Sequence, residues 1–410
     1  SRGQSSADRG KVLLHFGPKV DSWKKENEYD VSFCTTISQQ IPKDVAYMYE
    51  MLSKQGANVK SVSQIPFRTW GRVFTTLDKP ATGGKVIFLE GCKRSKGSSK
   101  APMVRLDLSG LKYFSVFPGQ TIAVEGVNAV GNTLVVKEIL AKGYAPMPDV
   151  PKLTKQLKLY VAAGPFTLPD NLNYQPLWDL VDRGVEDEPN LFILIGPFVD
   201  CTHSEIRKED LKDTFNEFFE KLLNKITKSF EGKRTRVVLV SSNRDIHHDP
   251  VYPTPEMPIS LYSTDSELKN LHVMPDPCVI NVEGLQIGIT SVDSVKHLGQ
   301  QEISNTPGMD RLGRLAAHIL SQSTFYPLYP PCNDLNVDTT LWKKFACFDE
   351  QPHILILPSD IRFYCKAINE CLVVNPERLQ KYIFAKLLIP AIADGESWNA
   401  NNVSCEIGKI

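Results

Sequence analysis

Hydrophobic residues in the C-terminal two-thirds of the chain form short runs that are apolar throughout. The runs are LKLYVAAG, LFILIG, RVVLVSS, CVINVEGLQIGITS, HILILPS and CLVVNP, which start at Leu157, Leu191, Arg236, Cys278, His353 and Cys371. Strands with this pattern belong to sheets that are buried on both faces. Helical stretches separate the runs, so residues 157–410 are predicted to form an α/β domain.

The clearest helical pattern covers residues 205–232, EIRKEDLKDTFNEFFEKLLNKITKSFEG. Gly232 stands at its end as a stop signal. Apolar side chains recur along it at three- and four-residue spacing, at Leu211, Phe215, Phe218, Phe219, Leu222, Leu223 and Ile226. This spacing predicts one helix whose apolar face packs on the core.

Residues 67–140 alternate between apolar and polar positions instead. The segments WGRVFTTL, GKVIFLEG, PMVRLDLSG, QTIAVEGVN and TLVVKEIL predict five short strands, which Gly, Pro, Asn or Asp residues separate. Five strands without a long helix are typical of a small closed barrel, most often an OB-fold. We therefore predict an OB-type β-barrel over residues 65–143 and a Pro-rich linker over residues 144–156.

Residues 1–64 have mixed character. The stretch IPKDVAYMYEMLSKQG, which begins at Ile41, predicts a short helix that ends near Gly56. The chain starts with Ser1 rather than Met, so we expect residues 1–64 to be the N-terminal extension of a fragment.

Composition fits a soluble, intracellular protein of two or three domains. The chain has 410 residues, of which 42% are hydrophobic and 23% charged. Its apolar runs are too short to span a membrane, so no membrane partner is expected. Its nine cysteines include no CxxC pair, which argues against a zinc knuckle and favours a reducing compartment.

Charge is distributed unevenly although the formal net charge is zero. Residues 66–142 contain 12 Lys/Arg against five Asp/Glu, so this module carries +7 and the remainder of the chain −7. A basic module favours contact with nucleic acid, and an acidic body favours a basic protein partner.

Polar residues follow several of the predicted strands, at the edge of the sheet where α/β proteins bind ligands. These loops read AAGPFTLPDN, IGPFVDCTH, SSNRDIHHD, ITSVDSVKHL and LPSDIRFYCK. Their order and spacing resemble the calcineurin-like metallophosphoesterases, whose loops read D-x-H, G-D-x-x-D, G-N-H-D/E, a lone His and G-H-x-H. In that family the loops hold two metal ions that activate a water molecule.

This chain keeps the loops but lacks most of the ligands. Pro197 stands where the resemblance places a metal-bridging Asp, and Arg244 stands where it places a His. A guanidinium group donates hydrogen bonds and cannot coordinate a cation. The resemblance therefore implies an inactivated phosphoesterase-like sandwich with no catalytic residue, no metal and no cofactor. The vestigial positions are Ala163, Gly164, Pro165, Gly196, Pro197, Asp200, Asn243, Arg244, Asp245 and Asp360.

The adjacent residues His247 and His248 are interpreted as turn residues, because neighbours on an extended chain point in different directions. One alternative remains open, a working phosphoesterase with a rearranged site. It requires a single metal held by Asp200, Asn243, Asp245, His247 and Asp360.

The barrel and the inactivated domain together resemble the B (accessory) subunits of the eukaryotic replicative DNA polymerases, the alpha–primase branch in particular. The stretches that carry this resemblance are AAGPFTLPDNLNYQPLWDL, LFILIGPFVDCTHSEI, VVLVSSNRDIHHDPVYPTPEMP, LPSDIRFYCK and VVNPERL. The resemblance implies a non-catalytic nuclear scaffold. Its partners would be the C-terminal domain of the catalytic subunit of DNA polymerase alpha and, through the complex, the primase subunits.

The predicted barrel also allows a second function, the binding of single-stranded nucleic acid. The basic loop KRSKGSSK offers weak contacts through Lys93, Arg94, Lys96 and Lys100. A stacking platform is the alternative, but packing inside the barrel is the favoured explanation of the aromatic residues Trp70, Phe74, Phe88, Tyr113 and Phe114.

Overall fold

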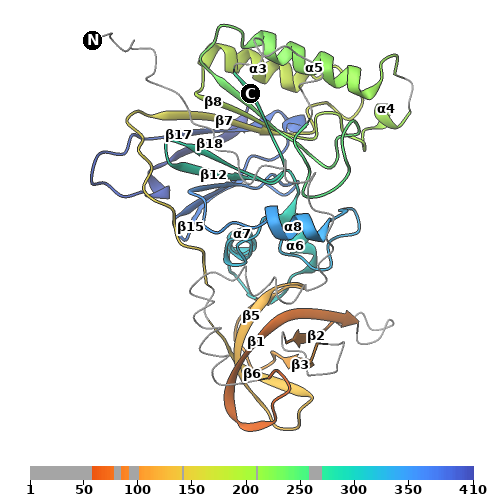
Figure 1. Ribbon diagram of the computed structural model, residues 1–410, viewed down its shortest axis with the longest axis vertical. Coiled ribbons are helices and arrows are strands. Elements are labelled where there is room, and N and C mark those ends of the chain that lie inside the picture. Colours follow the sequence, from red (N-terminus) through yellow and green to blue (C-terminus); the bar gives the residue numbers. More distant parts are fainter. Residues whose placement is uncertain (1–57, 78–84, 92–100, 141–142, 209–210, 258–269) are drawn as a thin grey trace.

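The computed structural model describes residues 58–77, 85–91, 101–140, 143–208, 211–257 and 270–410 (Figure 1). A β-barrel lies at one end of the molecule, and a larger α/β domain forms the rest. The helix predicted from Ile41 lies outside the described residues. No described helix is long and apolar enough to cross a membrane.

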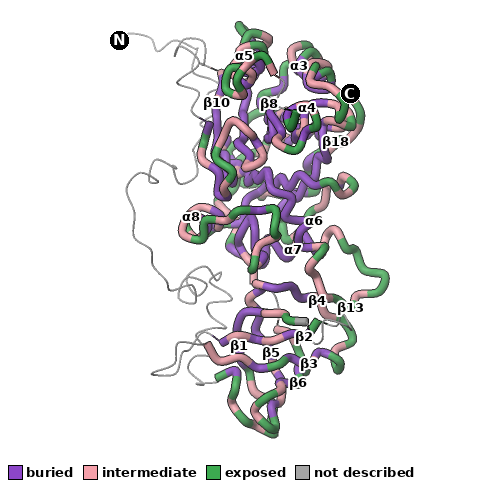
Figure 2. Tube along the Cα trace, turned by 90° about the vertical axis from the view of Figure 1, so that its right-hand side faces the viewer, coloured by how far each residue is buried: buried purple, intermediate pink, exposed green. Residues whose placement is uncertain are grey.

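Two sheets pack face to face in the α/β domain. The six-stranded sheet has the order β10 (Leu271–Met274), β9 (Arg236–Val240), β8 (Leu191–Ile195), β7 (Leu157–Ala163), β17 (Ile383–Ile389) and β18 (Ser404–Lys409). The five-stranded sheet has the order β11 (Cys278–Val282), β12 (Leu285–Ile289), β14 (Ile354–Ile356), β16 (Cys371–Asn375) and β15 (Tyr364–Ile368). Their inner faces share one core, which is visible as a continuous buried band in Figure 2.

Helices cover the outer face of each sheet. On the first sheet lie α3 (Gln175–Asp187) and α5 (Phe215–Ser229), which pack on outward side chains such as Tyr160. On the second lie α6 (Ser294–Gln301), α7 (Arg311–Ser321) and α8 (Thr339–Phe345). Both faces of each sheet are thus buried, as the continuously apolar runs predict.

The prediction of one helix over residues 205–232 is wrong in its extent. The chain forms a short helix α4 (Ser204–Arg207) and begins α5 separately. Thr214 is the N-cap of α5, and its side chain and that of Glu217 form a capping box. These bonds satisfy free N–H groups at the new helix start. The helix ends at Ser229, before Gly232, which adopts a positive φ of 72°.

The barrel closes with the strand order β1 (Ser63–Leu77), β2 (Lys85–Glu90), β3 (Met103–Asp107), β6 (Thr133–Ile139) and β5 (Thr121–Asn128). Its interior is filled by apolar side chains, among them Val73, Leu89, Val124 and Leu134. The five predicted strands are confirmed, and with them the predicted fold class, a barrel followed by an α/β sandwich.

The aromatic side chains of β1 and β2 do not fill this barrel. Trp70, Phe74 and Phe88 are half-buried and alternate with the core residues Val73 and Leu89, so they lie on the outer face. The explanation by packing inside the barrel is therefore wrong for these three residues. Phe114 does pack against the barrel core, whereas Tyr113 is exposed.

The barrel is docked on the α/β domain through a small shared sheet. Strand β4 (Phe114–Val116) of the barrel region pairs with β13 (Ile303–Asn305), which follows α6. Gln322 exchanges two hydrogen bonds with the backbone of Thr121, at 2.8 and 3.2 Å. On the outer face of β1, the guanidinium of Arg72 lies 4.6 Å from the ring centre of Tyr329. These contacts fix the barrel to the layer of α6 and α7.

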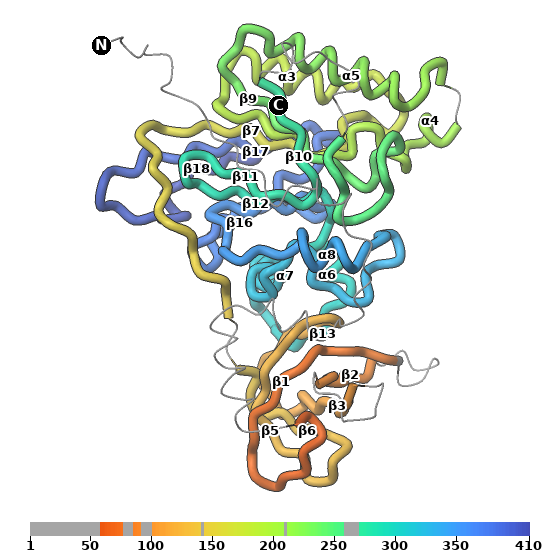
Figure 3. Tube along the Cα trace, viewed as in Figure 1, coloured from red at the N-terminus to blue at the C-terminus, as the bar shows by residue number. Residues whose placement is uncertain are grey.

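The segment that leads out of the barrel runs along one side of the α/β domain to β7 (Figure 3). Ala145 and Leu153 are buried, and Lys152 donates a backbone hydrogen bond of 2.8 Å to Glu283. The segment therefore packs on the sandwich along its length.

Candidate functional site

The loops after β7, β8 and β9 meet at the carboxyl edge of the first sheet, because these three strands are parallel. The first two loops are in direct contact: a Cβ on Gly164 would lie 2.1 Å from the carbonyl oxygen of Pro197. A Cβ on Gly196 would lie 2.8 Å from Oδ2 of Asp245. Glycine at both positions therefore permits the close approach of the loops.

Asp245 lies at the centre of this edge and is 1% exposed. Its Oδ1 accepts hydrogen bonds from the backbone N–H groups of Phe198 at 2.6 Å and Val199 at 2.8 Å. Burial raises the pKa of Asp245 to about 7, although these two hydrogen bonds favour the ionised form. Its Oδ2 has no hydrogen-bond partner among the described residues.

Asp200 and Arg244 form an ion pair beside Asp245. Nη2 of Arg244 lies 2.5 Å from Oδ2 of Asp200 and 3.1 Å from the hydroxyl of Thr202. Oδ1 of Asp200 accepts from the backbone N–H and the hydroxyl of Thr202, both at 2.9 Å. Both carboxylate oxygens are therefore occupied, and a fixed positive charge stands where the resemblance places a metal ligand.

A second arginine, Arg378, lies across the first and last loops. It is 2% exposed, and it donates to the carbonyl of Gly164 at 3.2 Å and to Asp360 at 3.1 Å. Its Nη2 also lies 3.7 Å from Oδ2 of Asp293. This residue was not among the predicted positions, although VVNPERL contains it. The available signal was a basic residue just after an apolar strand.

Asp360 has two cationic neighbours. Nζ of Lys296 donates to its Oδ2 at 2.7 Å, and Arg378 holds its Oδ1. Burial alone would raise the pKa of Asp360, but the hydrogen bond from Lys296 and the charge of Arg378 lower it to about 2. This carboxylate is therefore ionised and already neutralised by protein side chains.

The rearranged single-metal site is not assembled within the described part of the chain. No three of its candidates Asp200, Asp245, His247 and Asp360 have ligand atoms close enough to share an ion. The ring of His247 instead stacks on Phe219 of α5, with 4.0 Å between ring centres. Burial lowers the pKa of His247 to about 3, so the imidazole is neutral. Asn243 is a half-buried turn residue.

Two further histidines have structural roles. His203 is the N-cap of α4 and accepts from the N–H of Glu205 at 3.1 Å. His318 is fully buried on α7, 2.7 Å from the hydroxyl of Ser115. The basic loop with Lys93, Arg94, Lys96 and Lys100 lies outside the described residues, so its contact with nucleic acid stays a prediction.

Comparison with protein-family models matches both parts of the chain. The model for the B subunit of DNA polymerases alpha and epsilon matches residues 159–366, about half of the chain. The chain belongs to this family. The model for the OB domain of the DNA polymerase alpha B subunit matches residues 35–142, so the predicted resemblance is confirmed for both domains.

Relatives with curated names agree with the family. The chain is 32% identical to the DNA polymerase alpha B subunit of Rattus norvegicus over all of this chain and 69% of the relative. It is 33% identical to the protein of that name from Mus musculus, over 80% of this chain and 56% of the relative. It is 36% identical to the Drosophila melanogaster protein of that name, over 75% of this chain and 50% of the relative. The chain thus spans between 50% and 69% of the length of these relatives.

Solved structures similar to the chain include one described as a novel archaeal phosphodiesterase. It shares 11% sequence identity with a TM-score of 0.27, over 61% of this chain and 99% of that chain. A Thermus thermophilus protein, TT1561, shares 9% identity with a TM-score of 0.28, over 64% of this chain and 99% of its own.

Proposed function

We propose that this chain is a non-catalytic scaffold subunit of DNA polymerase alpha. It holds the C-terminal domain of the catalytic subunit and through it supports primer synthesis at the start of DNA replication. Membership of the polymerase B-subunit family and the names of the relatives support this assignment.

Two arginines occupy the loops that follow β7, β8, β9, β14 and β16, which we call the strand-end loops, and this observation carries the proposal. Arg244 neutralises Asp200, and Arg378 neutralises Asp360 while it donates to the carbonyl of Gly164. A two-metal hydrolase needs free carboxylates and imidazoles around its ions. Guanidinium groups in the same space repel a divalent cation and offer it no lone pair. These loops therefore suit protein contact rather than hydrolysis.

The docked barrel supports a partner surface that spans both domains. Because β4 pairs with β13, the barrel and the sandwich present one preorganised surface, and a partner loses little additional freedom on binding it. Outside residues 66–142 the chain carries −7, which favours a partner with a basic face. A permanent interface of this kind buries more than about 2,000 Å² in total.

Three further parts of the proposal follow from the same role. The protein acts in the nucleus, the primase subunits reach it through the complex, and DNA contact by the barrel is weak or indirect. The scaffold role itself needs no cofactor at the strand-end loops.

Gentle purification of the endogenous protein tests this function. We expect a polymerase catalytic subunit and two primase subunits to co-purify with it, identified by mass spectrometry. The endogenous protein carries an affinity tag for this purpose, and a parallel purification from untagged cells identifies the background proteins. Recovery of the chain without any polymerase subunit, at several salt concentrations, contradicts the proposal.

A further inference from the structure

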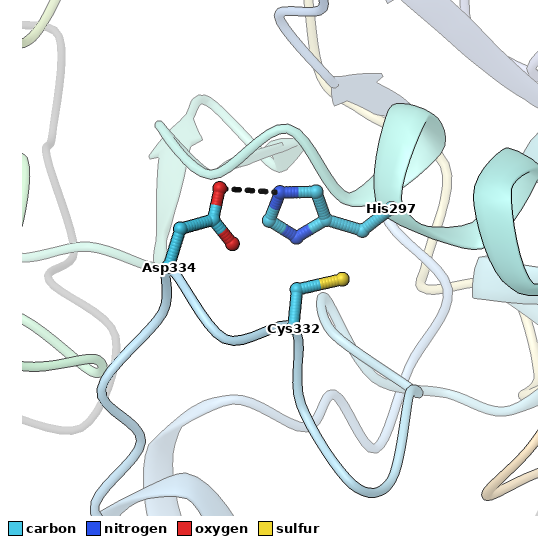
Figure 4. A group of neighbouring side chains, drawn as sticks. All are labelled: His297, Cys332 and Asp334. Carbon is cyan, nitrogen blue, oxygen red and sulfur yellow. Dashed lines mark ion pairs between the residues drawn. The ribbon is translucent and has the colours of Figure 1, made fainter.

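Three side chains with metal-binding atoms converge where α6 meets the loop between α7 and α8. His297 comes from α6, and Cys332 and Asp334 come from the loop between α7 and α8 (Figure 4). One ligand atom from each residue lies within 4.8 Å of the other two. Nε2 of His297 and Oδ2 of Asp334 are 3.6 Å apart.

We propose that His297, Cys332 and Asp334 bind a single divalent transition-metal ion, with zinc as the favoured ion. An imidazole nitrogen, a thiolate and a carboxylate are all zinc ligands. A tetrahedral zinc with its usual bond lengths separates neighbouring ligand atoms by about 3.3–3.6 Å. The observed 3.6 Å between His297 and Asp334 fits this spacing. The sulfur of Cys332 lies within 4.8 Å of the other two ligand atoms, so it moves closer to them when the ion binds.

Tyr326 holds two of the three ligands in place. Its hydroxyl lies 3.1 Å from Nδ1 of His297 and accepts a hydrogen bond of 3.1 Å from the backbone N–H of Cys332. Metal-binding histidines usually bond a protein group through the nitrogen that faces away from the ion. Here that bond turns Nε2 toward Asp334. Two prolines, Pro330 and Pro331, precede Cys332 and restrict its backbone.

The protonation states of the ligands are consistent with metal binding. Burial lowers the pKa of His297, which favours the neutral imidazole that a metal requires. Burial raises the pKa of Cys332, so without a cation this group is a thiol. On binding, the S–H bond breaks, a metal–sulfur bond forms and the proton passes to solvent.

A simple ion pair between His297 and Asp334 does not account for the cluster. Their 3.6 Å separation exceeds hydrogen-bond length, and the side chain of Asp334 is 76% exposed. Exposed pairs of this kind contribute little to stability. The exposed side of the cluster gives an ion access from solvent and leaves room for water as a fourth ligand.

The position of this metal site connects it to the docking of the barrel. Its loop also carries Tyr329, which donates a backbone hydrogen bond of 3.1 Å to Pro118 and whose ring lies under the guanidinium of Arg72. Helix α6, which carries His297, leads into β13 of the shared sheet. The ion therefore links the two segments on which the barrel rests.

Cobalt(II) titration of the full chain tests the site, because cobalt replaces zinc and gives a thiolate-to-metal absorption band. We expect one equivalent to bind and zinc to displace it. Cys332→Ser should abolish the thiolate band, and His297→Gln and Asp334→Asn should each weaken binding by more than tenfold. Cys201→Ser, which changes another half-buried thiol, should leave the titration unchanged.

Asp334→Asn keeps the experiment decisive if the other variants fold poorly, because Asp334 is exposed. An unchanged cobalt affinity in Asp334→Asn, or a thiolate band that survives Cys332→Ser, would overturn the proposal. So would a band that is lost in Cys201→Ser, since the metal would then lie at the strand-end loops. Binding without any thiolate band indicates adventitious surface sites and also contradicts it.

Discussion

Glu302 joins the barrel to the α/β domain, and we predict that Glu302→Gln is strongly destabilising. Its carboxylate accepts from Arg314 at 2.7 and 3.1 Å and from the hydroxyl of Ser115, in β4, at 2.6 Å. Nε2 of His318 lies 3.6 Å away. The side chains of Glu302 and Arg314 are only 3% and 13% exposed. The substitution removes the negative charge and leaves a buried guanidinium without its counterion.

The magnitude follows from this burial. Removing one member of a buried ion pair costs about 3–5 kcal/mol, because the remaining charge stays desolvated. The glutamine carbonyl still accepts some of these hydrogen bonds, so we expect the lower end, about 3 kcal/mol. Lys366→Gln is the matched control, because it breaks an ion pair with Asp310 whose side chains are 32% and 54% exposed. It should cost less than about 1 kcal/mol.

Urea unfolding of the full chain, followed by tryptophan fluorescence, measures both variants. The loss of unfolding free energy caused by Glu302→Gln should also depend on pH. Burial alone would raise the pKa of Glu302, but the nearby imidazole of His318 and the hydrogen bonds from Arg314 and Ser115 hold it well below its usual range. The stabilisation is therefore present above the unfolded carboxyl pKa of about 4.3 and declines as the pH falls below it. If Glu302→Gln costs no more than Lys366→Gln at pH 7, the buried link between the domains is refuted.

Three other predictions concern the strand-end loops and the barrel. Asp245→Asn should cost less stability at pH 8 than at pH 4 in thermal melts. The pKa of Asp245 is raised to about 7, so the contribution of its carboxyl group to stability is lost as the pH rises from about 4 to 7; an equal cost at both pH values contradicts this. The chain should hydrolyse no chromogenic phosphodiester with manganese, and Pro197→Asp should not restore activity; turnover that Asp245→Ala abolishes would refute the inactive site. Replacing Lys93, Arg94, Lys96 and Lys100 with Ser should reduce the salt dependence of weak single-strand binding, and tight binding that is unaffected would favour aromatic stacking.

Local patterns were sufficient to predict the strands, whereas the prediction of degenerate loops rests on the resemblance to metallophosphoesterases. The apolar runs at Leu157 and Leu191 indicated strands buried on both faces, and the structure places them side by side in one sheet. The resemblance implies that Pro197 and Arg244 replace metal ligands, and neither side chain has a lone pair for a metal. That chemistry is a property of the residue type, so the prediction required no tertiary information.

Features that depend on distant contacts could not be predicted in this way. Arg378 meets Gly164 across 214 positions, and no local pattern signals that contact. The orientation of Trp70 depends on which face of β1 lines the barrel, which only the closed sheet decides. His297 and Cys332 are likewise separated in sequence by α7, and no local pattern signals their approach. The break before α5 was locally encoded by Thr214 and Glu217, but the apolar spacing obscured it.

The most direct test of the scaffold function is the physical association of this chain with its proposed partner. The full chain and the C-terminal domain of the catalytic subunit of DNA polymerase alpha are co-expressed and separated by gel filtration. We predict that they co-elute as a complex with equal stoichiometry at moderate salt, and that the complex persists on dilution to low micromolar concentration. Separate elution of the two folded chains under these conditions would contradict the account.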